Sequence, residues 1–171
     1  YCLTSLGGHA NNNRITIRDN VITTSIVGFM FGYTENSAIY SNDFSDIDIG
    51  ILLQKDLSND IVYHNNFIKI IQYVDDININ NTILWDNGYP EGGNYWDNYN
   101  GSDTDNDGIG DTPYIISGED NQDRYPLMLP YNMTILSIII QPKNFKLLLF
   151  IKNIGNTTAF NVKWNITIEG F

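Results

Sequence analysis

Cysteine is almost absent from the sequence, which contains Cys2 alone among 171 residues. A single cysteine excludes an internal disulfide framework and does not indicate a redox compartment. No apolar run approaches the ~18 residues of a membrane span, and no basic stretch followed by an apolar one begins the chain. Because the chain starts with Tyr1 and its last segment stops within a pattern, we interpret it as part of a longer protein.

Basic residues are also scarce. The chain has 9 Lys and Arg against 20 Asp and Glu, a formal net charge of −11, which argues against an electrostatic nucleic-acid binder. Residues 93–130, here called the acidic segment, contain eight acidic residues and one basic residue, whereas residues 131–171 contain one and four. This concentration of carboxylates predicts a cationic partner. The hydrophobic content of 42% is sufficient for a packed core.

Asparagine is abundant and recurs with a period of about 22 residues. Four segments match the template aliphatic-x-x-Asn-x-(aliphatic or aromatic), centred on Asn20, Asn42, Asn65 and Asn87. A second feature follows eight residues later, where Gly28-Phe-Met-Phe corresponds to Gly50-Ile-Leu-Leu and Tyr73-Val takes the same place. Each unit contains short apolar stretches between turn residues, which excludes helices, and lacks the Leu-x-x-Leu-x-Leu pattern of leucine-rich repeats. The period therefore predicts a parallel β-solenoid.

In such a solenoid the coils stack about 4.8 Å apart, so equivalent residues lie above one another. We expect the four asparagines to form a ladder of amide hydrogen bonds at one corner and the apolar positions to fill the bore. The repeat resembles the NosD-like repeats of prokaryotic, often archaeal, exported and surface proteins. This resemblance implies a right-handed parallel β-helix of the pectate-lyase-like superfamily over roughly residues 13–92.

The acidic segment contains a metal-ligand pattern, Asp103-x-Asp105-x-Asp107-Gly108-Ile109-Gly110-Asp111. Alternate carboxylates converge on one ion when the chain curls, with a glycine at the sixth position, the backbone carbonyl of Ile109 at the seventh and Asp111 at the ninth. An all-oxygen set predicts Ca²⁺ rather than Mg²⁺ or a softer metal. The twelfth position is Tyr114 instead of the glutamate of an EF-hand. We expect the loop to be loose without the ion.

The flanking sequences Gly93-Asn-Tyr-Trp-Asp and Asp123-Arg-Tyr-Pro-Leu resemble the segment that closes NosD-like β-helices in surface proteins. This resemblance implies a calcium-bound cap over the solenoid end, where unpaired strand edges need cover. Five aromatic residues would supply that cover: Trp85, Tyr95, Trp96, Tyr99 and Tyr125. The same rings could instead form a platform that stacks on sugars.

Beyond residue 130 the pattern changes to strands of a different kind. Val162, Trp164, Ile166 and Ile168 alternate with polar residues, Phe145 to Ile151 is a second apolar run, and Met133 to Ile140 is a possible third. These stretches resemble the opening of the immunoglobulin-like, adhesion-type β-sandwiches that follow β-helices in surface proteins. The sequence thus predicts an all-β chain in three parts: coils over 1–92, a cap over 93–130 and the start of a sandwich over 131–171.

No catalytic constellation is evident. Asp43, Asp46, Asp48, Asp75 and Asp76 could serve a glycan-cleaving β-helix, but their spacing defines no cleft, and solvated strand-face acids are the simpler interpretation. Copper, associated with the NosD name, is not indicated, because the few Cys, His and Met residues are scattered.

The leading hypothesis is therefore a non-catalytic, calcium-stabilised structural or adhesion module, extracellular or at the cell surface, with surface glycans or envelope proteins as partners. The alternative is a carbohydrate-binding or carbohydrate-cleaving β-helix whose active coils lie upstream. Five Asn-x-Ser/Thr sequons would suit a glycosylated exported protein: Asn80, Asn100, Asn132, Asn156 and Asn165.

Overall fold

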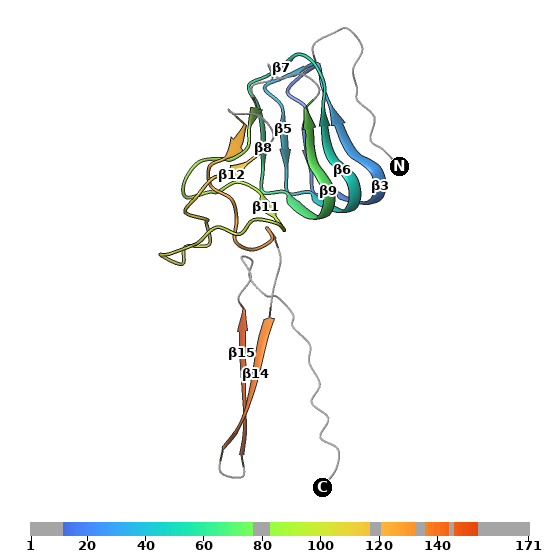
Figure 1. Cartoon of the computed structure of the whole chain (residues 1–171). Helices are drawn as coiled ribbons and strands as arrows, with labels where there is room; N and C mark the ends of the chain where they lie inside the picture. The colour runs from blue at the N-terminus through green and yellow to red at the C-terminus, as the bar shows by residue number, and fades with distance from the viewer. Residues whose placement is uncertain (1–11, 77–82, 117–120, 133–135, 144–145, 154–171) are drawn as a thin grey trace. The chain divides into compact units, whose positions relative to one another are not determined.

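A computed structural model describes residues 12–76, 83–116, 121–132, 136–143 and 146–153. Every regular element among these residues is a β-strand, and the chain divides into two compact units, residues 1–131 and 132–171. The first unit is a stack of parallel coils (Figure 1). The predicted all-β, parallel β-helix fold is therefore confirmed.

Three parallel sheets form the walls of the solenoid. Each of the first three coils adds one strand to each sheet, the last coil adds a strand to the second and third sheets, and the strand order within every sheet follows the coil order. The first sheet contains β1 (Asn12–Asn13), β4 (Thr34–Glu35) and β7 (Leu57–Ser58). The second contains β2 (Thr16–Arg18), β5 (Ala38–Tyr40), β8 (Asp60–Tyr63) and β10 (Ile83–Leu84). The third contains β3 (Val21–Phe31), β6 (Asp43–Leu53), β9 (Asn66–Asp76) and β11 (Tyr95–Trp96).

The register of these strands reproduces the repeat read from the sequence. Phe29 pairs with Ile51, which pairs with Val74, as the second repeat feature predicts. Between strands, and once within each long strand, the chain turns through residues with positive φ that recur in successive coils. These residues are Arg14, Asn36 and Asn59; Asp19, Ser41 and His64; Thr24, Asp46 and Lys69; and Tyr33 and Asp56. Stacked left-handed residues thus form the corners of the solenoid.

The bore is filled by apolar columns that run along the stack. Ile39 and Val62 lie in one fully buried column. A second column consists of aromatic rings: Phe44 stacks on Phe67 at 5.0 Å between ring centroids, and Phe67 stacks on Trp96 at 4.5 Å. Because each ring covers the next, the column excludes water along the stack of coils.

The asparagine ladder is present, with one correction. The Asn20 side chain donates to Asn42 Oδ1 and the Asn42 side chain to Asn65 Oδ1, each at 2.9 Å, as predicted. The next rung is Asn94, whose Oδ1 accepts from Asn65 at 2.9 Å. Asn87 is exposed, so its predicted place in the ladder was wrong. The last coil contains a longer connection before its ladder residue, which shifts the rung to residue 94.

The second unit contains an antiparallel pair of strands, β14 (Leu136–Lys143) and β15 (Lys146–Asn153), in register from Leu136 opposite Asn153 to Lys143 opposite Lys146. Both strands overlap the predicted apolar runs, although β14 extends three residues beyond Ile140. The alternating stretch from Val162 to Ile168 lies outside the described residues, so the sandwich stays a prediction.

Candidate metal centre and cap

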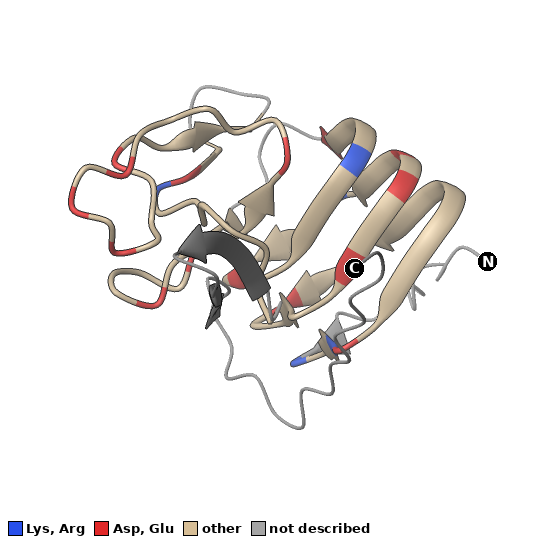
Figure 2. Cartoon of the chain, turned by 90° about the horizontal axis from the view of Figure 1, so that it is seen from below, with Lys and Arg blue, Asp and Glu red and all other residues tan. Residues whose placement is uncertain are grey.

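The acidic segment folds beyond the last coil, and many of its Asp and Glu residues lie in the loops there (Figure 2). It contains two short antiparallel strands, β12 (Tyr114–Ile115) and β13 (Gln122–Asp123). Residues 102–112 form what we call the acidic loop. This loop closes around one side chain, Tyr99, whose hydroxyl donates to the Thr112 carbonyl at 2.7 Å. A Cβ at Gly101 or Gly110 would collide with that hydroxyl, so a larger residue at either position would displace the Tyr99 side chain.

Backbone contacts hold the acidic loop against the returning chain. The amide of Gly110 donates to the Pro126 carbonyl at 2.8 Å, and the amide of Met128 donates to the Gly108 carbonyl at 3.0 Å. Ile109 is buried and forms an antiparallel bridge with Leu127. These contacts do not involve the loop carboxylates. The base of the loop is thus fixed by packing, whereas its tip carries the charges.

Three of the five predicted ligand residues converge at that tip. Carboxylate oxygens of Asp103, Asp105 and Asp107 all lie within 4.8 Å of one another. The chain curls through Asn106 and Gly108, which have φ values of 60° and 92°. Asp103 also accepts hydrogen bonds from the amides of Asp107 at 3.1 Å and Gly108 at 3.0 Å. The arrangement places three carboxylates on one side of a tight turn.

The other two predicted ligands have different surroundings. Asp111 is not part of the carboxylate group: its Oδ2 accepts from the hydroxyls of Ser102 at 3.0 Å and Thr104 at 2.6 Å, and these hydrogen bonds lower its pKa. Asp111 therefore closes the loop as a hydrogen-bond acceptor. Ile109 follows the carboxylates with its side chain buried and its amide donating to Asp107 Oδ1 at 2.8 Å.

Tyr89 approaches the acidic loop from the longer connection of the last coil. Its side chain is 62% exposed. A hydrogen bond with Asp107 and the negative charge of that carboxylate raise the pKa of the Tyr89 hydroxyl. The centroid of the Tyr89 ring also lies 6.2 Å from the centroid of the Tyr125 ring. Tyr89 thus connects the loop tip to the rest of the cap, a contact that sequence reasoning did not find.

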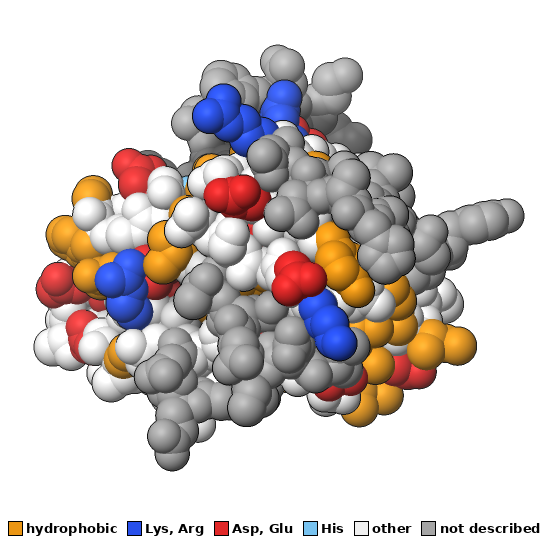
Figure 3. Space-filling view, turned by 90° about the horizontal axis from the view of Figure 1, so that it is seen from above, with side chains coloured by type: hydrophobic (Ala, Val, Ile, Leu, Met, Phe, Trp, Pro, Cys, Tyr) orange, Lys and Arg blue, Asp and Glu red, His pale blue; other side chains and the backbone are white. Residues whose placement is uncertain are grey.

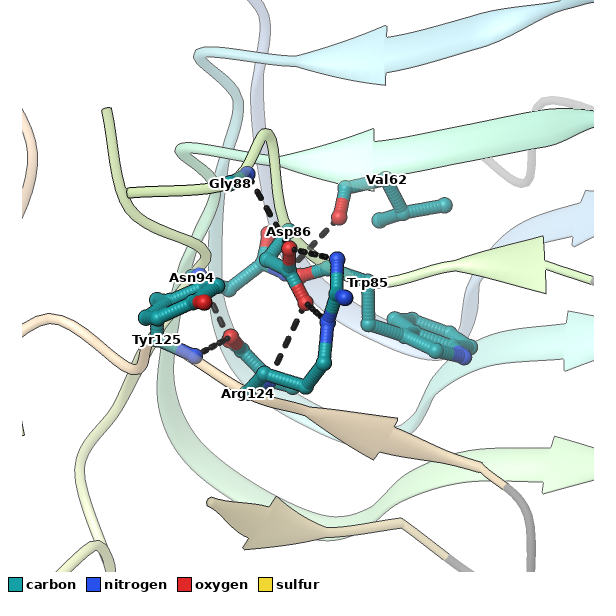
Figure 4. Close-up of polar contacts among 8 residues, drawn as sticks. Val62, Trp85, Asp86, Gly88, Asn94, Arg124 and Tyr125 are labelled. Atoms are coloured by element: carbon teal, nitrogen blue, oxygen red, sulfur yellow. Dashed lines mark hydrogen bonds and ion pairs between the residues drawn. The ribbon is translucent and has the colours of Figure 1, made fainter. Parts of the chain in front are cut away.

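An ion pair fastens the cap to the last coil (Figure 4). Asp86 is buried, and Arg124 donates to it through Nε at 2.9 Å and through a terminal nitrogen at 2.7 Å. The amides of Gly88 and Arg124 add two further hydrogen bonds. Burial alone would raise the pKa of Asp86, but the hydrogen bonds and charge of Arg124 lower it overall. The pair joins segments 38 residues apart in the chain.

A second buried carboxylate, Asp123, lies next to the ladder and is fully buried at 0% exposure. Its Oδ2 accepts from the amide of Asn94 at 2.6 Å and from the indole Nε1 of Trp96 at 2.9 Å, and its Oδ1 accepts from the amide of Tyr125 at 3.1 Å. A Cβ at Gly93 would collide with the carboxylate. Burial raises the pKa of Asp123 to about 7 despite these three donors.

The predicted aromatic cover is partly confirmed. Trp85 and Trp96 are buried in the core and Tyr99 packs against it. The ring that ends the aromatic column is Tyr114, which stacks on Trp96 at 4.5 Å and was missed because its place depends on how the acidic segment folds back. With Phe67 on one face and Tyr114 on the other, Trp96 has no free face for a sugar.

The acids considered for catalysis lie on β6 and β9. Asp46 and Asp48 are exposed on β6, and Asp46 pairs with Lys69 at 3.5 Å across the corner. Asp43 accepts from the side chain of Asn66 at 2.6 Å. Of the sequons, Asn100 and Asn132 are exposed. Asn80, Asn156 and Asn165 lie outside the described residues.

Three parallel sheets, a buried asparagine ladder and a capped end define the chain as a parallel β-helix protein. Residues 7–101 match the family described as periplasmic copper-binding protein (NosD), and the chain belongs to this family. Comparison with curated proteins and with solved structures gives no match. Within the described residues, no helix is long and apolar enough to cross a membrane.

The described residues do not fit the copper that the family description names. Copper prefers imidazole and sulfur ligands, and the one group of potential ligands found among the described residues consists of carboxylates. His64, the histidine in this part of the chain, is buried, donates from Nε2 to the Glu91 carbonyl at 2.6 Å and stacks on Tyr131 at 3.9 Å. His64 is therefore a packing residue of the cap. Cys2 and His9 lie outside the described residues.

Proposed function

We propose that this chain is a non-catalytic structural module of an exported protein, in which Ca²⁺ bound by the acidic loop stabilises the cap of a β-helix. The convergence of Asp103, Asp105 and Asp107 within 4.8 Å carries this proposal. At neutral pH three carboxylates so close together repel one another, and a divalent cation removes that repulsion. The base of the loop is attached to the end of the solenoid, so ordering its tip also strengthens the cap.

The net charge of −11 does not favour binding of a polyanion. On the face shown in Figure 3, basic side chains lie beside one another at the top edge and beside acidic ones elsewhere. Membership of a periplasmic family supports export. We propose an extracellular or cell-surface location, with envelope proteins or surface glycans as the partners that the module displays or spaces. Asn100 and Asn132 are the exposed sequons available for glycosylation in such a location.

Thermal unfolding in calcium and in EDTA tests the proposal. We expect the melting temperature to fall on chelation, because the folded loop binds the ion and the unfolded chain does not. Asp105→Asn should lower the melting temperature in calcium and abolish the difference between calcium and EDTA. Asp48→Asn, which removes an exposed carboxylate from β6, is the matched control and should retain the full difference. Equal melting temperatures in calcium and EDTA for the wild-type chain would contradict the proposal.

A further inference from the structure

Asp123 follows Asn94 at the end of the asparagine ladder, where a further rung would lie. Within the ladder, the amide of each asparagine donates to the side-chain Oδ1 of the following rung, for example from Asn42 to Asn65 and from Asn65 to Asn94, each at 3.1 Å. The amide of Asn94 donates instead to Asp123 Oδ2, at 2.6 Å. Asp123 therefore accepts the last backbone hydrogen bond of the ladder.

The same carboxylate connects the returning leg of the acidic segment to the last coil. It binds Asn94 and Trp96 on the coil, and Tyr125 on its own leg. On either side of it, the amide of Gly93 donates to the Tyr125 carbonyl at 2.7 Å and the amide of Leu127 donates to the Asn94 carbonyl at 2.9 Å. The returning leg therefore pairs with the coil around one buried ionisable group.

We propose that Asp123 is a pH-responsive latch, which holds the acidic segment on the last coil with a strength set by the protonation of its carboxyl group. This inference does not depend on the calcium site. When the leg detaches, the carboxyl group reaches water and ionises freely. When the leg is docked, ionisation leaves a charge in a fully buried position. Docking is therefore stronger with the neutral acid than with the carboxylate.

The direction of the pH effect follows from the two states. Burial raises the pKa of Asp123 from 3.8 to about 7 in the docked state. Between these values the docked state binds more protons than the detached state, so docking weakens as the pH rises from about 4 to about 7 and is constant above that. Within this window the docking equilibrium should change by up to about tenfold per pH unit.

Other charged groups near the latch act differently. Asp86 and Arg124 are the charged neighbours of Asp123, and the contribution of their pair is lost only as the pH falls through the lowered pKa of Asp86. His64, whose amide donates to the Gly93 carbonyl, has a pKa lowered by burial, so its contribution to stability decreases at acid pH, opposite to that of Asp123. Both contributions are the same in the wild-type chain and in a variant that changes Asp123 alone. The difference between these two proteins therefore reports the effect of Asp123.

Amide hydrogen exchange measured from pH 4 to pH 8 tests the latch in the chain as it stands. Protection factors of the Asn94 and Leu127 amides should fall by up to about tenfold per pH unit up to pH 7. The Asp43 amide, bonded within the first coils, should change less, through the buried carboxylate Asp60, whose pKa is also raised by burial. Asp123→Asn should abolish the pH dependence at the latch. The control Asp48→Asn alters an exposed carboxylate of β6 and should retain it.

The outcomes separate the latch from a general effect on stability. Equal pH dependence at Asn94 and Asp43 would overturn the proposal, because Asp123 would then act on the whole fold. A pH dependence that persists in Asp123→Asn would overturn it as well. If that variant does not fold, a carbon-13 titration of the Asp123 carboxyl group in the wild-type chain decides: a midpoint near 7 supports the latch, and a midpoint at or below 4 refutes it.

Discussion

At the scale of single residues, the fold depends on polar side chains that satisfy buried backbone groups. Asn65 is the clearest case, since it is fully buried and its side-chain nitrogen donates to the carbonyls of Ile39 and Tyr63, each at 3.0 Å. Its Oδ1 accepts from both the amide and the side chain of Asn42. One amide side chain therefore joins neighbouring coils.

Replacing Asn65 with alanine should be strongly destabilising. Asn65→Ala removes these hydrogen bonds and leaves buried donors and acceptors unpaired, each at a cost of about 1–3 kcal/mol. We expect a loss of at least about 3 kcal/mol in the free energy of unfolding, measured by urea denaturation. The control Asn87→Ala, at the exposed position once assigned to the ladder, should change it by less than about 0.5 kcal/mol. Comparable losses for the two variants would show that the ladder is energetically unimportant.

The corners contain residues in a backbone conformation that their side chains disfavour. Thr24 has a φ of 54°, which a β-branched residue rarely adopts, and asparagine tolerates this region better. Because Thr24 is exposed, Thr24→Asn should relieve strain without disturbing the core and raise the stability by about 1 kcal/mol. Thr23→Asn, one residue earlier in β3, should give no such gain. Denaturation curves of the two variants would distinguish them, and a destabilised Thr24→Asn would contradict this explanation.

At the scale of elements, sequence reasoning succeeded where the repeat is regular. The spacing of the asparagines and the Gly28 and Gly50 segments gave the register of β3, β6 and β9, because stacked coils place equivalent residues in contact. It failed in the last coil. There Trp85 enters the core, and Asn94 and Trp96 resume the pattern only after a longer connection. Asn87 matched the repeat template by chance at the expected spacing, so the prediction placed the last rung there.

The candidate site shows the same division between local and long-range information. The convergence of Asp103, Asp105 and Asp107 depends on local chain curvature and was predictable from their spacing and Gly108. The separation of Asp111 from the group was not, since it depends on the hydroxyls of Ser102 and Thr104. Asp86, Arg124 and Asp123 were missed because they acquire their partners through the return of the acidic segment.

Tyr114 provides a test of the cap as an element. It ends the aromatic column by stacking on Trp96, and its ring is half-buried against the core. Tyr114→Ala should expose Trp96 and lower the free energy of unfolding by about 2 kcal/mol. Tyr114→Phe retains the ring and loses only the hydrogen bond between its hydroxyl and the Asn98 side chain, so it should cost less than about 1 kcal/mol. The measurement is intrinsic tryptophan fluorescence during denaturation, where a red-shifted native spectrum is expected for the alanine variant only. An unchanged spectrum and stability for that variant would show that Tyr114 does not cover the column.

At the scale of the whole molecule, two different kinds of interaction stabilise the coils and the cap. The coils are held mainly by apolar columns and a neutral hydrogen-bond ladder, together with the buried carboxylate Asp60, whose pKa is raised by burial. The cap contains the buried Asp86–Arg124 pair, the buried Asp123 and the acidic loop. We therefore expect divalent cations and chelators to affect the cap first and the coils through it.

Isothermal titration of Ca²⁺ into the metal-free chain tests the central claim most directly. The account predicts one bound ion per chain with a Kd of about 10⁻⁴–10⁻³ M, the range of extracellular calcium modules, and loss of binding in Asp105→Asn but not in Asp48→Asn. Absence of binding at millimolar Ca²⁺, or equal binding by the wild-type chain and Asp105→Asn, would contradict it.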